Sequence, residues 1–248
     1  MKPTITDYSY IGVGRIYLRD RNGTGGLVPI GNVGKLNFAV SEEAKDLPDF
    51  TSAGGGTRNE VRRITGVETK ITLHDLSPGN LSLALYGDST AIAGGSAVSE
   101  NATAKLGAIT KLANVGATNA VVKDATDTTT YVAGADYEIR GGGIYIPPTG
   151  SSITEDDVLH VSYDYPGQDV IEALTQAAGE YEMLFDGINE ARSGKASVVN
   201  AHRVRFGAAG NLDLIGDNYA GLELTGKLLT DDTQGAGLSR FFKTTVVQ

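Results

Sequence analysis

The chain has 248 residues, of which 40% are hydrophobic, 33 are glycine and none is cysteine. Without cysteine, disulfides, thiolate metal sites and cysteine nucleophiles are excluded, and a reducing compartment is favoured. The formal net charge of −9 argues against a surface built to grip nucleic acid, which needs clustered Lys and Arg. An acidic wall would instead repel phosphate and let nucleic acid pass.

Strand signals open the chain. Val, Ile, Leu and Tyr occur in short runs between glycine-rich turns, as is typical of a mainly β protein. Residues 10–18 alternate loosely, and in residues 35–40 the side chains of Leu36, Phe38 and Val40 fall on one face. Both segments are predicted to be strands, and no run in the chain is long enough to predict a membrane span.

A long loop is expected next, over residues 41–59. It contains a glycine triplet at 54–56, and loops of this length are usually functional or disordered. Opposite charges stand at its two ends, with Glu and Asp prominent in residues 42–46 and Arg in residues 58–63. Two interpretations remain open: a solvated hairpin, or charge complementarity between identical subunits that sets their register.

The clearest strand in the sequence spans residues 63–76. A period of two divides its side chains into an apolar face and a polar face. The apolar face, expected to pack on a core, carries Val67, Thr69, Ile71 and Leu73. The polar face, expected to meet water or a partner, carries Glu68, Lys70, Thr72 and His74.

A short helix is predicted after this strand. Ser77 can cap it, Pro78 suits its first turn, and Gly87 suits its end. Leu81, Ala84 and Leu85 share a face, which is the spacing of a helix that lies on a sheet. A helix this short needs tertiary packing to hold it.

A change of composition predicts two domains. Small residues dominate from position 91, and strand signals then recur about every ten residues up to Gly167, which predicts a small antiparallel sandwich. After Gly167 the strand patterns of the first part of the chain return, and residues 219–229 again alternate between apolar and polar side chains. The predicted domain organisation is one discontinuous domain, 1–93 and 168–248, interrupted by an inserted β-rich domain, 94–167.

No catalytic constellation emerges. Residues 221–228 nearly match a phosphate-binding loop but lack its final Ser or Thr and lie within an alternating strand. The three histidines fall on separate strands without metal-ligand spacing, and no nucleophile elbow is present. We therefore expect no enzyme activity, no cofactor and no metal.

The order of features carries a resemblance. The segment KDLPDFTSAGGGTRNEVRRITGVETKITLHDLSPGNLSLALYG, residues 45–87, resembles the major tail tube proteins of long-tailed, non-contractile bacteriophages. YIGVGRIYL at 10–18 and GNVGKLNF at 31–38 fit the same pattern. The resemblance covers the first 90 residues well, and the last 80 residues only in their general character. The inserted part looks like a decoration module found in some members of the family.

The resemblance implies a tail-tube-type β-sandwich or barrel with one short flanking helix and a long hairpin loop. It implies homohexameric rings stacked into a tube, which meet tape measure and tail terminator proteins. DNA would pass through the tube into the host without specific binding. The protein would be made and assembled in the bacterial host cytoplasm and would end in the virion, with the inserted domain on the tube exterior.

The implied contact sites are two groups of side chains. Candidates for inter-subunit or inter-ring contacts in the loop are Glu42, Glu43, Lys45, Asp46, Asp49, Phe50, Arg58, Arg62 and Arg63. Candidates for the lumen are Glu68, Lys70, Thr72, Glu223 and Thr225, and the sequence does not choose between the two strands that carry them.

Two other functions are compatible with the sequence. A secretion-system tube ring shares the β-tube architecture by resemblance. A carbohydrate- or cell-surface-binding sandwich would need exposed aromatic side chains, for which the inserted domain offers Tyr131, Tyr137, Tyr145, Tyr163 and Tyr165 but no Trp.

Overall fold

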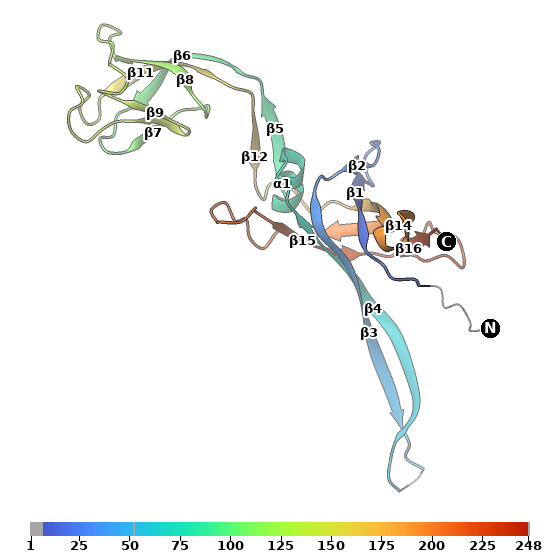
Figure 1. The fold of residues 1–248 in the computed structure, drawn as a ribbon. Coiled ribbons are helices and arrows are strands. Elements are labelled where there is room, and N and C mark those ends of the chain that lie inside the picture. The colour runs from blue at the N-terminus through green and yellow to red at the C-terminus, as the bar shows by residue number, and fades with distance from the viewer. Residues whose placement is uncertain (1–6, 52, 248) are drawn as a thin grey trace. The chain divides into compact units, whose positions relative to one another are not determined.

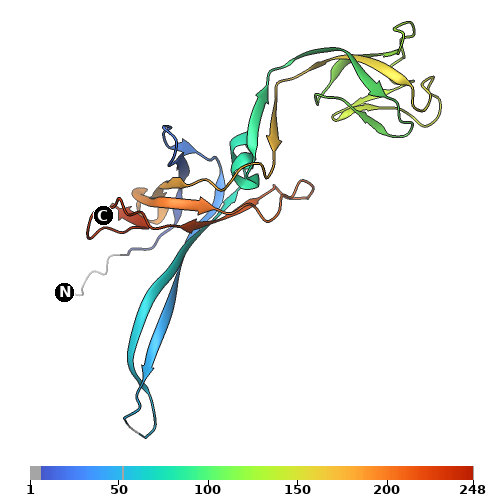
Figure 2. The same ribbon diagram turned by 180° about the vertical axis from the view of Figure 1, so that it is seen from behind.

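The computed structural model describes residues 7–51 and 53–247 (Figures 1 and 2). It is mainly β, with 52% of residues in strands and one α-helix in the described part, which confirms the predicted fold class. Two compact units are present: unit 1 is Met1–Asp88 with Ile171–Gln248, and unit 2 is Ser89–Val170. The boundaries predicted from the sequence, 93/94 and 167/168, are close to these, and residues 1–6, 52 and 248 of the predicted first domain lie outside the described residues.

Unit 1 is built on one antiparallel sheet. Its path among the described residues is β2-β1-β13-β14-β15-β4-β3, with β16 pairing β14 beside this path, and it does not close into a barrel there. Its strands are β1 (Gly12–Asp20), β2 (Val28–Pro29), β3 (Val33–Pro48), β4 (Thr57–Leu73), β13 (Tyr181–Asn189), β14 (Lys195–Phe206), β15 (Leu222–Leu228) and β16 (Phe242–Val246). A 3-10 turn, η1 (Glu190–Arg192), follows β13.

One face of this sheet is the core of unit 1. Along β15 every second residue is buried, and in β4 the predicted apolar set from Val67 to Leu73 is buried as well. Both strands add to a cluster that includes Phe206 of β14 and Met183 of β13. The expected alternation is therefore confirmed for Val67–Leu73 and Leu222–Leu228, whereas residues 63–65 are exposed on both sides and residues 74–76 and 219–221 lie outside the strands.

The predicted loop over residues 41–59 is wrong in its extent. β3 continues to Pro48 and β4 begins at Thr57, so the two strands form a long hairpin that projects from the sheet (Figure 1). The two strands are joined at the tip, where the Asp49 N–H donates a 2.7 Å hydrogen bond to the Gly56 carbonyl. All three glycines of the triplet have positive φ, which explains why glycine occupies these positions.

Helix α1 (Pro78–Leu85) begins as predicted but ends and packs differently. The Ser77 hydroxyl accepts from the Asn80 N–H, while Tyr86, not Gly87, takes the left-handed conformation at the other end. Ala84 is buried, but Leu81 and Leu85 are only half-buried. The buried polar residue is Asn80, whose amide donates to the Ile30 and Asp75 carbonyls and so ties the helix to the chain before it.

Unit 2 consists of two three-stranded antiparallel sheets around a separate core. The sheets have the orders β7-β10-β9 and β6-β11-β8 among the described residues. The strands are β6 (Gly95–Thr103), β7 (Ile109–Lys111), β8 (Thr118–Asp124), β9 (Glu138–Arg140), β10 (Gly143–Tyr145) and β11 (Val158–Tyr165). Strands β5 (Asp88–Ile92) and β12 (Gln168–Glu172) pair with each other where the chain passes from one unit to the other.

Candidate functional site

The five predicted lumen residues lie together on one surface of unit 1. Directly paired residues of antiparallel strands share a face, and Glu223 pairs with Thr72 while Thr225 pairs with Lys70. Two candidate strands that the sequence could not rank are thus neighbours. Each side chain is exposed except Thr72, which is half-buried, and all five lie opposite the buried core face.

The sheet adds four residues that the sequence prediction missed. Lys35 pairs with Thr72 and Asn37 pairs with Lys70, from β3. On the other side, Lys227 of β15 pairs with Glu68 and with Arg205 of β14. Alternation placed each of these on the polar side of its own strand, but only strand pairing brings them together. We call this surface the polar face: Lys35, Asn37, Glu68, Lys70, Thr72, Arg205, Glu223, Thr225 and Lys227.

The polar face has more cations than carboxylates, in contrast to the acidic chain. Its positively charged residues are Lys35, Lys70, Arg205 and Lys227, and its carboxylates are Glu68 and Glu223. In the part of the chain that the structure describes, none of the three lysines forms an ion pair, whereas Arg205 shares Glu180 with Arg203. Hydrogen bonds from Arg203 and Arg205 lower the pKa of Glu180, so this carboxylate stays ionised.

The predicted contact residues of the loop are spread over both strands of the hairpin and its turn. Glu42, Glu43, Lys45 and Asp46 are on β3, Asp49 and Phe50 are in the turn, and Arg58, Arg62 and Arg63 are on β4. Arg62 contacts Glu60 and stands 4.0 Å from Glu42, and Glu43 is directly opposite Arg63 in the register. The hairpin thus satisfies part of its charge internally.

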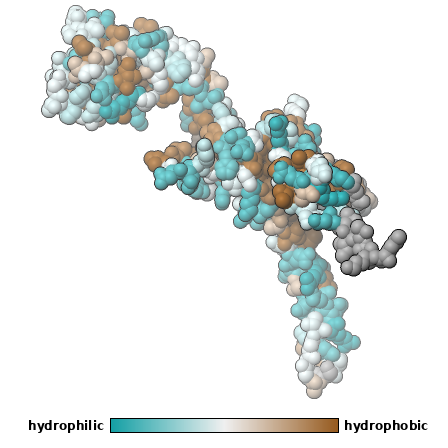
Figure 3. All heavy atoms as spheres, in the orientation of Figure 1, coloured by the Kyte–Doolittle hydropathy of each residue, from teal (hydrophilic) through white to brown (hydrophobic). Residues whose placement is uncertain are grey.

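The hairpin is exposed on both faces. Every described residue of 39–65 is exposed except Asp49. In Figure 3 hydrophobic side chains gather where the hairpin leaves the sheet, hydrophilic ones follow along its middle, and residues of intermediate hydropathy cover most of its outer end. Large apolar side chains are nevertheless exposed along it, with Phe50 83%, Ile64 55% and Leu47 52% accessible.

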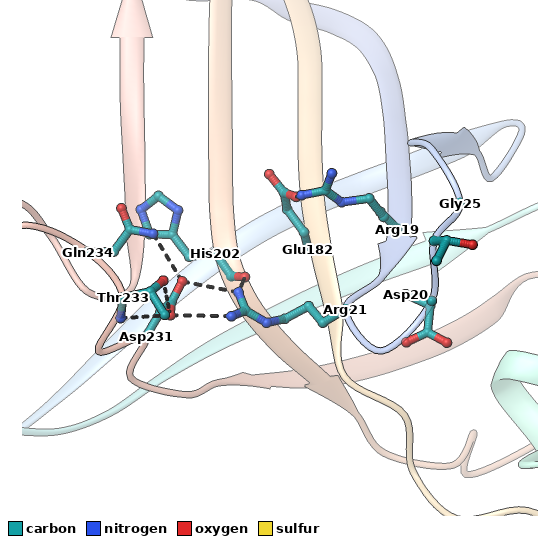
Figure 4. Close-up of a pocket in the computed structure, with 11 residues that line it drawn as sticks. Arg19, Asp20, Arg21, Gly25, Glu182, His202, Asp231, Thr233 and Gln234 are labelled. Carbon is teal, nitrogen blue, oxygen red and sulfur yellow. Dashed lines mark hydrogen bonds and ion pairs between the residues drawn. The ribbon is translucent and has the colours of Figure 1, made fainter.

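A polar pocket of about 470 Å³ lies where β1 ends (Figure 4). Arg21 donates to both carboxylate oxygens of Asp231, at 3.1 and 3.3 Å, and to the His202 carbonyl. Arg19 is paired with Glu182. Because both arginines are already neutralised, the arrangement ties β1 to the segment after β15 and offers no unpaired guanidinium to a ligand.

Asp231 is the most enclosed charge of this pocket. Its side chain is 4% exposed and accepts from Gln234 Nε2 at 3.0 Å and Thr233 Oγ1 at 2.8 Å, besides Arg21. These donors hold the pKa of Asp231 well below its ordinary value. The carboxylate is therefore a structural anion at neutral pH.

The segment that nearly matches a phosphate-binding loop is a strand. Residues 222–228 form β15, in which Gly226 points at the core and Lys227 at solvent. A Cβ on Gly226 would stand 2.9 Å from each of Phe206 Cδ1, Thr69 Cγ2 and Val204 Cγ1. The glycine is thus required by close packing. Across residues 7–51 and 53–247 no group of three or more His, Asp or Glu is placed to hold a metal ion.

We predict that Gly226→Ala lowers the free energy of unfolding by about 1–3 kcal/mol, because the methyl group overpacks the core. Urea denaturation of both proteins would measure this difference. Gly207→Ala is the matched control, since its Cβ would make an ordinary 3.5 Å contact with the Thr225 carbonyl. Equal stability of the two variants would contradict the packing explanation.

The tyrosines of unit 2 do not form an aromatic binding platform. Tyr137 and Tyr163 are buried, with 2% exposure each, and Tyr131 and Tyr165 are half-buried. Tyr145 is also half-buried, and the guanidinium of Arg140 covers its ring at 3.8 Å. The feature that a carbohydrate-binding module would need is therefore lacking among the described tyrosines of this unit.

Comparison with known proteins supplies a family. No curated protein matches the sequence. None of the helices among the described residues has the length and apolar character needed to cross a bilayer. The family match extends over nearly the whole chain, both units included: the chain belongs to the family described as Protein of unknown function UCP028589, whose model matches residues 9–245.

Proposed function

We propose that this chain is a structural subunit that assembles into hexameric rings, stacked as the tail tube of a long-tailed, non-contractile bacteriophage. The proposal starts from the resemblance of residues 45–87 and is carried by one structural observation, the exposed hairpin. An isolated two-stranded ribbon is marginally stable in water, and a ribbon needs a further strand or a packed layer to become stable. A second copy of the chain is the partner that supplies such a layer.

The free strand edges of unit 1 support the same proposal. β3 ends the sheet on one side, and β1 pairs with β2 only through Tyr17 and Leu18, which leaves its first half unpaired on that side among the described residues. A cleft of about 540 Å³ separates these two strands and is lined by Val13, Leu36 and Phe38. Exposed edges invite pairing with another chain, and ring closure would satisfy them.

In this assembly the polar face lines the lumen, and unit 2 decorates the exterior. The tube performs no chemistry: it carries DNA into the host and meets tape measure and tail terminator proteins at its ends. The subunit is made in the bacterial cytoplasm and resides in the virion. Four strands from each of six subunits, spaced about 4.8 Å apart and tilted about 45°, enclose a backbone cylinder roughly 50 Å across, which admits a duplex.

Electron microscopy of the purified full chain tests the proposal. At rising protein concentration, size-exclusion chromatography should show a shift from subunit to large assemblies, and negative staining should show rings and tubes. Monomers that persist at high concentration would overturn the proposal. A secretion-system tube ring would also give rings, and finding the chain in purified virions would separate the two assignments.

A further inference from the structure

We propose that the polar face is a weak, sequence-independent contact surface for the phosphate backbone of duplex DNA. The inference rests on the proposed function for its biological setting, since it names what this face meets inside the tube. It goes beyond an inert passage, because it assigns the contact to particular cations. The physical basis is the distribution of charge between the two units and within the sheet.

The acidic balance of the chain is not the balance of this face. Unit 2, residues 89–170, has ten Asp and Glu against four Lys and Arg. Within unit 1 the polar face has four cations against two carboxylates, and Arg205 is already paired with Glu180. The excess of positive charge therefore comes from the three lysines, one of which, Lys227, is directly opposite Glu68. The net charge of the whole chain therefore does not describe the charge of this face.

The spacing of the cations suits a phosphate backbone. Neighbouring strands lie about 4.8 Å apart, and alternate residues on one strand lie about 7 Å apart. Three adjacent strands each contribute one lysine: Lys35, Lys70 and Lys227. Each lysine occupies a different position along the strands, so the three form a diagonal line across the face. The hydroxyl groups of Thr72 and Thr225 lie between them and are further donors of the kind that contacts phosphate oxygens.

The surrounding features fit a polymer better than a small ligand. The face is the exposed side of a sheet, and its lysines have no carboxylate partner within ion-pair distance in the described chain. Lysines on such a surface bind phosphate as point charges and release counterions, which gives affinity without reading bases. A polyanion gains from several such charges at once, whereas a single small anion does not.

Fluorescence anisotropy with a labelled random-sequence duplex tests the inference on the full chain, kept at concentrations where it is a monomer. We expect binding at low ionic strength whose logarithm falls linearly with the logarithm of salt concentration. The face variant is Lys35→Gln with Lys70→Gln and Lys227→Gln. It should bind more weakly and reduce the salt slope by about 1 for each lysine that contacts a phosphate.

The control removes the same charge elsewhere: Lys105→Gln with Lys111→Gln and Lys123→Gln, all in unit 2. It should retain the affinity and the salt slope of the parent chain. Thermal unfolding of both variants establishes that they are folded. Equal losses in the two variants, an unchanged face variant, no binding by the parent, or equally tight binding of polyglutamate would each overturn the inference. Because the assay uses monomers, its outcome is independent of whether tubes form.

Discussion

Replacing Leu47 and Phe50 with aspartate is expected to abolish tube formation and to leave the subunit folded. Both side chains are exposed, so the changes should alter the free energy of unfolding of the monomer by no more than about 0.5 kcal/mol for each site. In an assembled tube, however, a buried apolar anchor replaced by a charge costs several kcal/mol of binding. Negative-stain microscopy and thermal unfolding would measure the two effects.

The matched control for this experiment is Val98→Asp. Val98 is in β6 of unit 2, and its 81% exposure is comparable to the 83% exposure of Phe50. Tubes should form normally in this variant, because unit 2 is proposed to lie on the exterior. Tubes that persist after the hairpin substitutions would show that the hairpin is not an inter-subunit contact.

Asp231→Asn is expected to lower the free energy of unfolding by about 1.5–3 kcal/mol at neutral pH, the range for a hydrogen bond to a charged group. The amide cannot accept from Arg21, Thr233 and Gln234 as the carboxylate does. The guanidinium of Arg21, 28% exposed, loses its ionic partner. Urea denaturation would measure this loss. If the dependence of the unfolding free energy on urea concentration keeps the same slope, the substitution has changed stability alone.

The pH dependence of this difference has a definite sign. The folded-state pKa of Asp231 is lowered chiefly by the donors Gln234, Thr233 and Arg21. Its contribution is therefore present above the unfolded-state pKa of about 3.9 and is lost as pH falls through that value toward the lower folded one. The variant and the parent should converge in acid. Asp232→Asn, which breaks only the exposed pair with Arg240, should cost less than about 1 kcal/mol at any pH.

Sequence patterns predicted those elements whose two sides face different surroundings. β4 and β15 alternate between core and solvent, so their buried sets were visible as apolar residues with a period of two. The helix start was visible because Ser77 and Pro78 have local roles. The split into an interrupted and an inserted unit followed from a change of composition, which is also a local signal.

The remaining features depend on distant contacts that no local pattern encodes. Residues 41–48 are strand with both sides exposed, so they lack apolar alternation and were predicted as loop. The ion pair between Arg21 and Asp231 joins residues that are 210 positions apart in the sequence. The polar face is a product of strand pairing, since Lys35 and Arg205 become neighbours of the β4 and β15 side chains only through the register.

The paired strands β5 and β12 give the chain a practical use as a scaffold. Gly94 follows β5 and Gly167 precedes β12, and a Cβ built on Gly94 would be 3.0 Å from the Gly167 nitrogen. A foreign domain whose termini are adjacent could be inserted between these two glycines without separating β5 from β12. Proteins generally tolerate domain insertions at such sites. A self-assembling version would then present its cargo in many regularly repeated copies.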